Sequence, residues 1–253
     1  MNTTGIAWTD LTWNPATGCK AVSAACSYCY ARTTAEAKRG TVAFPDGFEV
    51  RFYPERLSQP ARRKKPARIF AGSMTDFFQV DLSDDQRDQI FDAIEAAPQH
   101  TFQLLTKRPA RAWKFFQRRP VPPNVWLGTT IEDNAHVYRA DFLRRIDVAV
   151  RFISAEPLLE PLPNLDLNGI AWLIVGGESG SHLWNATTRA ANSLAERVDK
   201  RWVPRADRLQ WVRALRDRCH AAGVAFFFKQ WGGATTKAAG CLLDGREWKE
   251  FPQ

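Results

Sequence analysis

Three cysteines lie close together near the start of the chain, in the stretch GCKAVSAACSYCY at residues 18–30. Six residues separate Cys19 from Cys26, and two residues separate Cys26 from Cys29. Thiolates at such spacing bind soft metal centres, including zinc and iron–sulfur clusters, and a CxxC pair also supports thiol–disulfide chemistry. The stretch contains no histidine, so a centre bound by these three thiolates keeps one coordination position open.

Four interpretations of this triad compete. Redox-inert packing does not require the clustering, and a thiol–disulfide pair at Cys26 and Cys29 leaves Cys19 without a role. A structural zinc site needs four ligands, whereas Cys219, Cys241 and the four histidines are remote in sequence. A 4Fe–4S cluster held by three thiolates, with one iron open to a non-protein ligand, uses all three cysteines. The residues by themselves leave these alternatives open.

Composition indicates the setting in which these thiols act. The chain has 253 residues, of which 45% are hydrophobic, and no apolar run approaches the roughly 20 residues that span a bilayer. Its first residues do not form a secretory signal, so we expect a cytoplasmic protein with no membrane partner. An odd count of five cysteines in a reducing compartment argues against a disulfide framework. The net charge of +8 fits either solvated basic surfaces or a nucleic-acid partner.

Short apolar runs alternate with helical patterns along the chain. Their continuous apolar character predicts parallel strands buried on both faces, at 11–13, 67–72, 101–106, 124–130, 150–156, 171–177 and 224–229. Ser83 and Gln86 form a capping box at the start of one expected helix, and Gly223 ends another. The expected fold is α/β, a complete or partial TIM-like (β/α) barrel. We expect a single domain over 1–253, with a loop-rich insertion at 180–203 and a C-terminal extension at 232–253.

Polar or glycine residues follow nearly every predicted strand. The segments are GSMTD (72–76), TKR (106–108), GTTIED (128–133), SAEP (154–157), GGESG (176–180) and KQWGG (229–233). In barrel enzymes the carboxyl ends of the strands carry the chemistry. Carboxylates at such a mouth require cationic partners, for which Lys107, Arg108 and Lys229 are the candidates. A salt-bridged rim is the structural alternative for these charged groups.

A three-cysteine loop after the first strand of a partial barrel resembles the radical S-adenosylmethionine superfamily. The usual spacing there is C-x3-C-x-aromatic-C. CSYC matches the second half, with Tyr28 as the aromatic residue, whereas the first gap is six residues instead of three. A closer resemblance, to an uncharacterised three-cysteine family common in bacteriophages and prophages, rests on WTDLTWNPATGC, CSYCYA, GSMTDFF, LLTKRP, WLGTTIED, ISAEPLL, WLIVGGESG and FFFKQWGG. That family is regarded as radical-S-adenosylmethionine-like, with relatives compared to DNA photoproduct repair lyases.

The resemblance implies an iron–sulfur enzyme in which Cys19, Cys26 and Cys29 bind a 4Fe–4S cluster. The open iron would take the amino and carboxylate groups of S-adenosylmethionine, and one electron from an external donor would yield methionine and a 5′-deoxyadenosyl radical. The implied cofactor-binding residues are Tyr28, Gly72, Ser73, Met74, Thr75, Thr130, Glu132 and Ser154. The candidate catalytic residues are Lys107, Glu156, Glu178 and Lys229.

The expected substrate is a nucleic acid or a nucleotide. Ten tryptophans, the basic stretches and segment 180–203 provide aromatic rings for stacking and cations for phosphate, although tryptophans also pack between helices and barrel. The alternative function is a non-enzymatic, zinc-stabilised nucleic-acid-binding protein of phage origin. A third reading is a degenerate barrel that binds the cofactor without cleaving it. The sequence does not indicate the oligomeric state.

Overall fold

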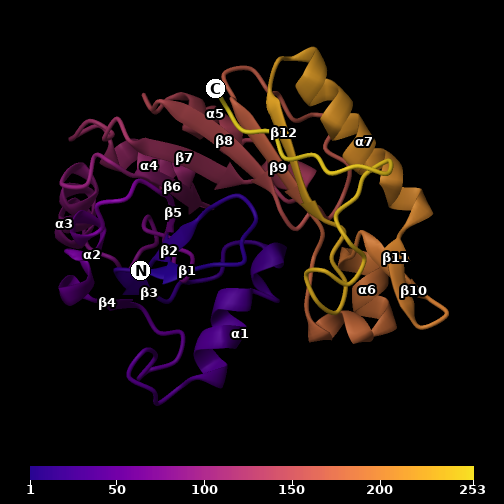
Figure 1. The fold of residues 1–253 in the computed structure, drawn as a ribbon, viewed down its shortest axis with the longest axis horizontal. Helices are drawn as coiled ribbons and strands as arrows, with labels where there is room; N and C mark the ends of the chain where they lie inside the picture. Colours follow the sequence, from indigo (N-terminus) through magenta and orange to yellow (C-terminus); the bar gives the residue numbers. More distant parts are fainter. The chain divides into compact units, whose positions relative to one another are not determined.

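The computed structural model describes residues 1–253 and divides into two compact units, coloured along the sequence in Figure 1. Unit 1 comprises Met1–Thr129 and Arg145–Ala149, and unit 2 comprises Thr130–Arg144 and Val150–Gln253. No helix is both long enough and apolar enough to cross a membrane.

The strands of the larger sheet of unit 1 run parallel, apart from the first. In spatial order they are β1 (Asn2–Thr3), β2 (Leu11–Trp13), β5 (Arg68–Ala71), β6 (Thr101–Thr106) and β7 (Val125–Thr130). β1 pairs antiparallel with β2, and every later pair is parallel. Most side chains of β5, β6 and β7 are buried regardless of the face from which they project, which explains their unbroken apolar sequence.

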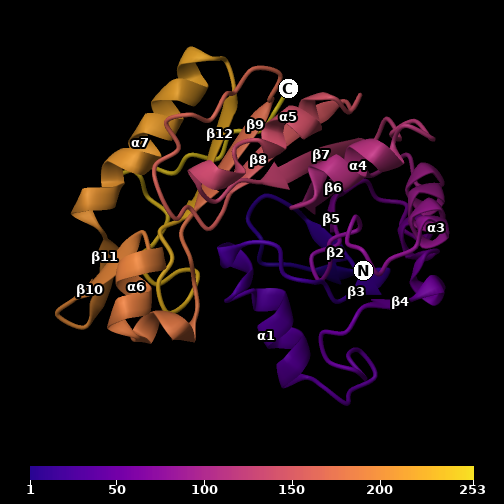
Figure 2. The same ribbon diagram turned by 180° about the vertical axis from the view of Figure 1, so that it is seen from behind.

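Four α-helices accompany these strands, and Figure 2 shows two of them, α3 and α4, beside the strands of their unit. The helices are α1 (Tyr30–Ala37), α2 (Gln59–Arg62), α3 (Asp84–Glu95) and α4 (Pro109–Phe115), with 3₁₀ turns η1 (Ala24–Cys26) and η2 (Pro54–Arg56). The predicted capping box starts α3, because Gln86 N donates to Ser83 Oγ and Ser83 N donates to Gln86 Oε1. A two-stranded sheet, β3 (Ala16–Thr17) and β4 (Arg51–Phe52), pairs antiparallel.

Unit 2 contains three parallel strands, β8 (Val150–Ala155), β9 (Trp172–Gly176) and β12 (Ala225–Gln230), in that spatial order. Its helices are α5 (Arg139–Arg144), α6 (Ala186–Asn192) and α7 (Ala206–Ala221), with 3₁₀ turns η3 (Asn134–His136) and η4 (Ser181–Trp184). α7 packs beside β12 and buries Val212, Leu215 and Cys219, as the helical spacing predicts (Figure 1).

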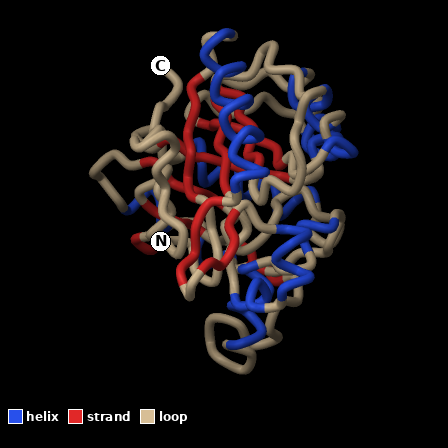
Figure 3. Tube along the Cα trace, turned by 90° about the vertical axis from the view of Figure 1, so that its right-hand side faces the viewer, coloured by secondary structure: helices blue, strands red, loops and turns tan.

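The segment expected to be a loop-rich insertion contains η4, α6 and an antiparallel hairpin, β10 (Ala195–Val198) and β11 (Arg201–Pro204). The C-terminal extension returns to β12, where Phe228 N donates to Trp248 O at 2.8 Å and Glu250 N donates to Phe226 O at 3.2 Å. Figure 3 distinguishes these strands and helices by colour. All seven strands expected from apolar runs are present within a residue of their predicted ends, and the α/β class is confirmed.

Candidate functional site

The three clustered cysteines lie on three successive local structures of unit 1. Cys19 follows Gly18, where φ is +84° and an added Cβ would lie 2.3 Å from the carbonyl oxygen of Glu49. Cys26 is the last residue of η1, and Cys29 is the N-cap of α1. Because both the positive φ and the close approach require glycine, the backbone at Gly18 determines where Cys19 leaves the β3–β4 sheet.

The loop that carries the cysteines is attached to the turn that follows β5. Gly18 N donates to Met74 O at 3.0 Å, and Thr75 Oγ1 donates to Gly18 O at 2.6 Å. The Asn14 side chain exchanges hydrogen bonds with the Ser73 hydroxyl and accepts one from Met74 N at 2.9 Å. The hydroxyls expected to contact S-adenosylmethionine therefore have partners within the protein. Each hydroxyl still has a lone pair that can accept a hydrogen bond from a cofactor.

An apolar cluster lies against two of the cysteines. Its buried members are Ala31, Ala35 and Phe48, and Cys19, Cys29, Phe44 and Met74 pack against it. Tyr28, expected near an adenine ring, is 38% exposed. Gly72 has a φ of +86°, and a Cβ there would lie 3.2 Å from the Phe77 ring. The cluster keeps water away from one side of Cys19 and Cys29. The lower local dielectric strengthens electrostatic interactions at the two sulfur atoms.

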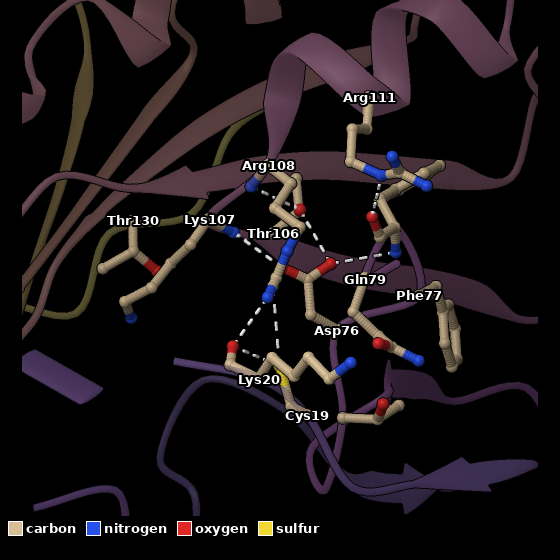
Figure 4. A network of polar contacts seen from close by, with 12 residues as sticks. Cys19, Lys20, Asp76, Phe77, Gln79, Thr106, Lys107, Arg108, Arg111 and Thr130 are labelled. Carbon is tan, nitrogen blue, oxygen red and sulfur yellow. Dashed lines mark hydrogen bonds and ion pairs between the residues drawn. The ribbon is translucent and has the colours of Figure 1, made fainter. Parts of the chain in front are cut away.

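A buried ion pair joins the cysteine loop to the ends of β5 and β6 (Figure 4). Arg108 Nη1 lies 2.9 Å from Asp76 Oδ2, and each side chain is 8% exposed. Arg108 Nη2 donates to the carbonyl oxygen of Lys20 at 2.6 Å, while Nη1 lies 3.5 Å from Cys19 Sγ. Burial and the charge of Asp76 raise the pKa of the Cys19 thiol, and Arg108 opposes them. Lys107, a predicted catalytic residue, donates its backbone N–H to Asp76.

The pKa of the Cys26 thiol is shifted in the opposite direction to that of Cys19. Burial acts to raise the pKa of its thiol, but hydrogen bonds from the backbone at Val22 and Ser23, together with the charge of Lys107, hold that pKa below its ordinary value. A lowered pKa favours the thiolate, which is the form that binds metals and attacks electrophiles. The Lys107 ammonium thus affects the sulfur chemistry of the loop, in addition to the catalytic role predicted for it.

The donor set fits an iron–sulfur cluster in type. Cys19, Cys26 and Cys29 are free and partly exposed, and three thiolates are the ligands that such clusters use. No group of three or more His, Cys, Asp or Glu side chains is gathered closely enough in this structure to hold a metal ion. To bind a cluster, the loop must therefore change conformation so that its three sulfur atoms come closer together. The free energy of metal binding commonly drives such ordering.

Two predicted catalytic residues meet in unit 2. Lys229 Nζ lies 2.5 Å from Glu156 Oε1, and Gln230 Nε2 donates to the same oxygen at 3.0 Å. Glu156 follows β8, whereas Lys229 and Gln230 end β12. Gly176, at the end of the intervening β9, leaves room for the carboxyl group, since a Cβ there would lie 3.1 Å from the carboxyl carbon. The arrangement places a cation and a carboxylate where a polar ligand could contact them.

Glu178, the third unit 2 candidate, stands at a close backbone crossing. Its Oε1 accepts a hydrogen bond from Ser179 N at 2.9 Å, and its carbonyl oxygen accepts one from Gly233 N at 3.1 Å. A Cβ at Gly232, where φ is +86°, would lie 2.0 Å from that carbonyl oxygen. The glycines of KQWGG therefore let the loop after β12 touch the loop after β9 and hold Glu178 in place.

Thr130, Glu132 and Ser154 are buried, at 1%, 0% and 3% exposure. Arg139 Nη1 donates to Glu132 Oε2 and to Thr130 O, each at 2.8 Å, whereas Glu132 Oε1 has no hydrogen-bond partner. Ile131 N donates to Ser154 O at 3.0 Å. These contacts place the three residues in the interior of unit 2, and their assignment to a cofactor stays a prediction.

Sequence reasoning missed several residues that position these candidates. Asn14, Asp76 and Gln230 were not singled out, and Arg108 was named only as a partner for a carboxylate. Asp76, Arg108 and Gln230 belong to the polar segments at strand ends, so their place in the chain was the available signal. Which partner each side chain reaches depends on how neighbouring strands align.

Residues 3–205 and 202–252 match the family described as "Protein of unknown function (DUF5131)". No curated protein matches the sequence. A solved structure of spore photoproduct lyase complexed with dinucleoside spore photoproduct is similar, with a TM-score of 0.53 and 13% identity over 87% of this chain and 74% of that chain. A mutant of that lyase with bound AdoMet and dinucleoside spore photoproduct has a TM-score of 0.53 and 12% identity over 89% and 76%.

A further mutant of the lyase has a TM-score of 0.55 and 13% identity over 92% of this chain and 78% of that chain. At such identities the likeness shows a shared fold. The predicted α/β fold of partial-barrel type is thereby confirmed. The expected phage association stays a prediction.

Proposed function

This chain belongs to the DUF5131 family. We propose that it is a radical S-adenosylmethionine enzyme whose 4Fe–4S cluster is bound by Cys19, Cys26 and Cys29. One observation carries the proposal. Three free thiols occupy a single loop that is fixed by hydrogen bonds to the turn after β5. The fold shared with a lyase whose structure holds AdoMet supports it.

When bound, the cluster would supply the reductive cleavage of S-adenosylmethionine to methionine and a 5′-deoxyadenosyl radical, with an electron from an external donor. The protein's own residues would bind the cofactor and exclude water from the site. The apolar cluster beside Met74 shields Cys19 and Cys29, and the turn after β5 offers backbone groups to the cofactor. In unit 2, Glu156 and Lys229 form a charged pair that can bind and orient polar groups of a substrate.

We extend the proposal to a nucleic-acid or nucleotide substrate, supported by an aromatic and basic surface of unit 2. Trp184 is 53% exposed and stands edge-on to Trp202, with 5.7 Å between ring centroids. Arg197 lies 4.9 Å from the centroid of the Trp184 ring, and Arg189 lies 5.8 Å from that of Trp202. Indole rings stack on bases while guanidinium groups bind phosphates. The similar lyase was solved in complex with dinucleoside spore photoproduct.

Metal analysis after anaerobic reconstitution tests the proposal. We expect about four irons and as many labile sulfides per chain, as for clusters of this type, and the loss of both when Cys19, Cys26 or Cys29 is replaced by alanine. Cys241→Ala is the matched control and should retain the cluster. Stoichiometric zinc without sulfide would overturn the proposal in favour of the zinc-stabilised nucleic-acid-binding alternative.

Turnover requires its own assay. Reduction of the loaded protein with dithionite in the presence of S-adenosylmethionine should release 5′-deoxyadenosine, detected by chromatography. A loaded protein that binds the cofactor and releases none of this product would instead be a degenerate barrel, and the enzyme assignment would be withdrawn.

A further inference from the structure

The Arg108 guanidinium group contacts a sulfur atom of the cysteine loop, Cys19 Sγ (Figure 4). Its planar fork reaches three groups at once. Nη1 contacts Asp76 Oδ2 at 2.9 Å and Cys19 Sγ at 3.5 Å, while Nη2 donates to the Lys20 carbonyl oxygen at 2.6 Å. A rigid fork can hold a carboxylate and a backbone segment in a fixed relation, which a lysine ammonium cannot do in the same way.

Hydrogen bonds from the surrounding protein hold the Asp76 carboxylate in place. Its Oδ1 accepts hydrogen bonds from Phe78 N at 2.9 Å and Thr106 Oγ1 at 2.8 Å. Its Oδ2 accepts from Lys107 N at 3.0 Å and from Arg108. A buried carboxylate with four donors has its desolvation largely compensated, so the pair can persist in the interior. The ends of β5 and β6 therefore hold Arg108 rigidly against the loop.

We propose that Arg108 and Asp76 position Cys19 and set the reduction potential of the cluster that the loop would bind, with opposite signs. This inference rests on the proposed function for its redox part, because it concerns the same cysteine. The anchoring part concerns the protein before any cluster is present, and it can be tested separately.

The opposite signs follow from electrostatics. Reduction of the cluster adds one electron, taken from an external one-electron donor, and therefore adds negative charge beside Cys19. The Arg108 cation stabilises that charge and raises the potential, as hydrogen bonds to cluster sulfurs do. The Asp76 carboxylate neutralises part of the Arg108 charge and so lowers the potential. A pair with only a packing role would give no such opposition.

Potentiometric titration of the reconstituted protein, followed by electron paramagnetic resonance, tests the redox part. Arg108→Met should lower the ratio of reduced to oxidised cluster about tenfold at a fixed solution potential, which is ~59 mV for a one-electron couple. Asp76→Asn, which keeps the shape of the side chain, should shift the ratio the other way. Shifts of the same sign, or none in either variant, would overturn the inference while leaving the proposed function intact.

A matched control comes from α4, the helix that follows Arg108. Arg111 of α4 donates Nε–H to Phe78 O at 2.8 Å, on the segment that carries Asp76 (Figure 4). Arg111→Met should leave the potential unchanged. If Arg108→Met loses the fold, the double variant Arg108→Met with Asp76→Asn removes both buried charges together and keeps the interior neutral.

Amide hydrogen exchange of the metal-free protein tests the anchoring part. We expect amides of residues 18–22 to exchange about tenfold faster in Arg108→Met, as the loss of one charge-assisted hydrogen bond implies. Arg108→Lys should also speed exchange there, because a single ammonium cannot replace the fork, yet it should retain most of the potential. Unchanged exchange in both variants would refute the anchoring role, whether or not the protein ever binds a cluster.

Discussion

Lys229 and Glu156 form an ion pair in unit 2 at the carboxyl ends of β12 and β8, with 2.5 Å between Nζ and Oε1. Their side chains are 18% and 20% exposed. Gln230 donates to the same oxygen, and the absence of a Cβ at Gly176 leaves space for the carboxyl group. The pair thus stands at the end of the strands where parallel sheets carry their chemistry.

Lys229→Met should lower the free energy of unfolding by about 1–2 kcal/mol, because the half-buried Glu156 carboxylate loses its cationic partner while solvent still screens part of its charge. Urea denaturation measures this change. Lys249→Met is the control, since Lys249 pairs with Glu247 where both side chains are over 40% exposed. Its effect should stay within about 0.5 kcal/mol. Equal losses in the two variants would show that the Glu156 pair has no special environment.

Gly18→Ala should displace Cys19 and destabilise the protein. The new Cβ would lie 2.3 Å from Glu49 O, at a φ of +84°. Gly40→Ala is a close control because Gly40 has the same φ of +84° with nothing within 4 Å of the added Cβ. The backbone strain of about 1–3 kcal/mol is then common to both, and only Gly18→Ala adds the clash. We expect a lower melting temperature and lost iron in Gly18→Ala, with iron retained in Gly40→Ala.

More of the fold than of the candidate site could be predicted from the sequence. Strands buried on both faces leave continuous apolar runs, which is why β5 to β9 and β12 could be located from sequence. The β3–β4 and β10–β11 pairs have short strands without such runs. Ala16 pairs with Phe52, and the pairing depends on a partner distant in the chain. Propensity within one segment does not encode that partner.

At the candidate site, the spacing of the cysteines identified them as candidate ligands. The contacts between residues at the strand ends could not be predicted from the sequence. Asp76 and Arg108 meet because Ala71 pairs with Leu104 in the β5–β6 register, and a single sequence does not display that register. The contact between Glu132 and Arg139 in the interior of unit 2 was likewise not evident from the sequence. Runs that are apolar on both faces lack the alternation that would show which way each side chain points.

In the metal-free protein, Cys26 should react with iodoacetamide at lower pH than Cys19 or Cys219. The pKa of Cys26 is lowered, so its thiolate appears earlier as pH rises, whereas burial raises the pKa of Cys19 and raises that of Cys219 to about 12. Peptide mass spectrometry of timed samples gives each rate. Lys107→Met should move the Cys26 curve to higher pH, since a cation that favours the thiolate is lost. Faster labelling of Cys19 than Cys26 at neutral pH would contradict this assignment.

Trp184→Ala should weaken binding of single-stranded oligonucleotides if the surface around Trp184 and Trp202 stacks bases. One lost stacking contact corresponds to about 1–3 kcal/mol, or roughly a 5- to 150-fold rise in Kd. Fluorescence anisotropy with a labelled oligonucleotide at constant salt measures it.

Arg197→Gln should weaken the same binding and also flatten its salt dependence, because a phosphate contact releases counterions whereas a stacking contact does not. Trp184→Phe is the conservative variant and should retain most of the affinity, since a phenyl ring still stacks. Val198, 47% exposed on the same hairpin, offers a control in Val198→Ala, which removes apolar surface without a ring or a charge. If Val198→Ala weakens binding as much as Trp184→Ala does, general hydrophobic adhesion explains it, and the nucleic-acid surface must be sought elsewhere.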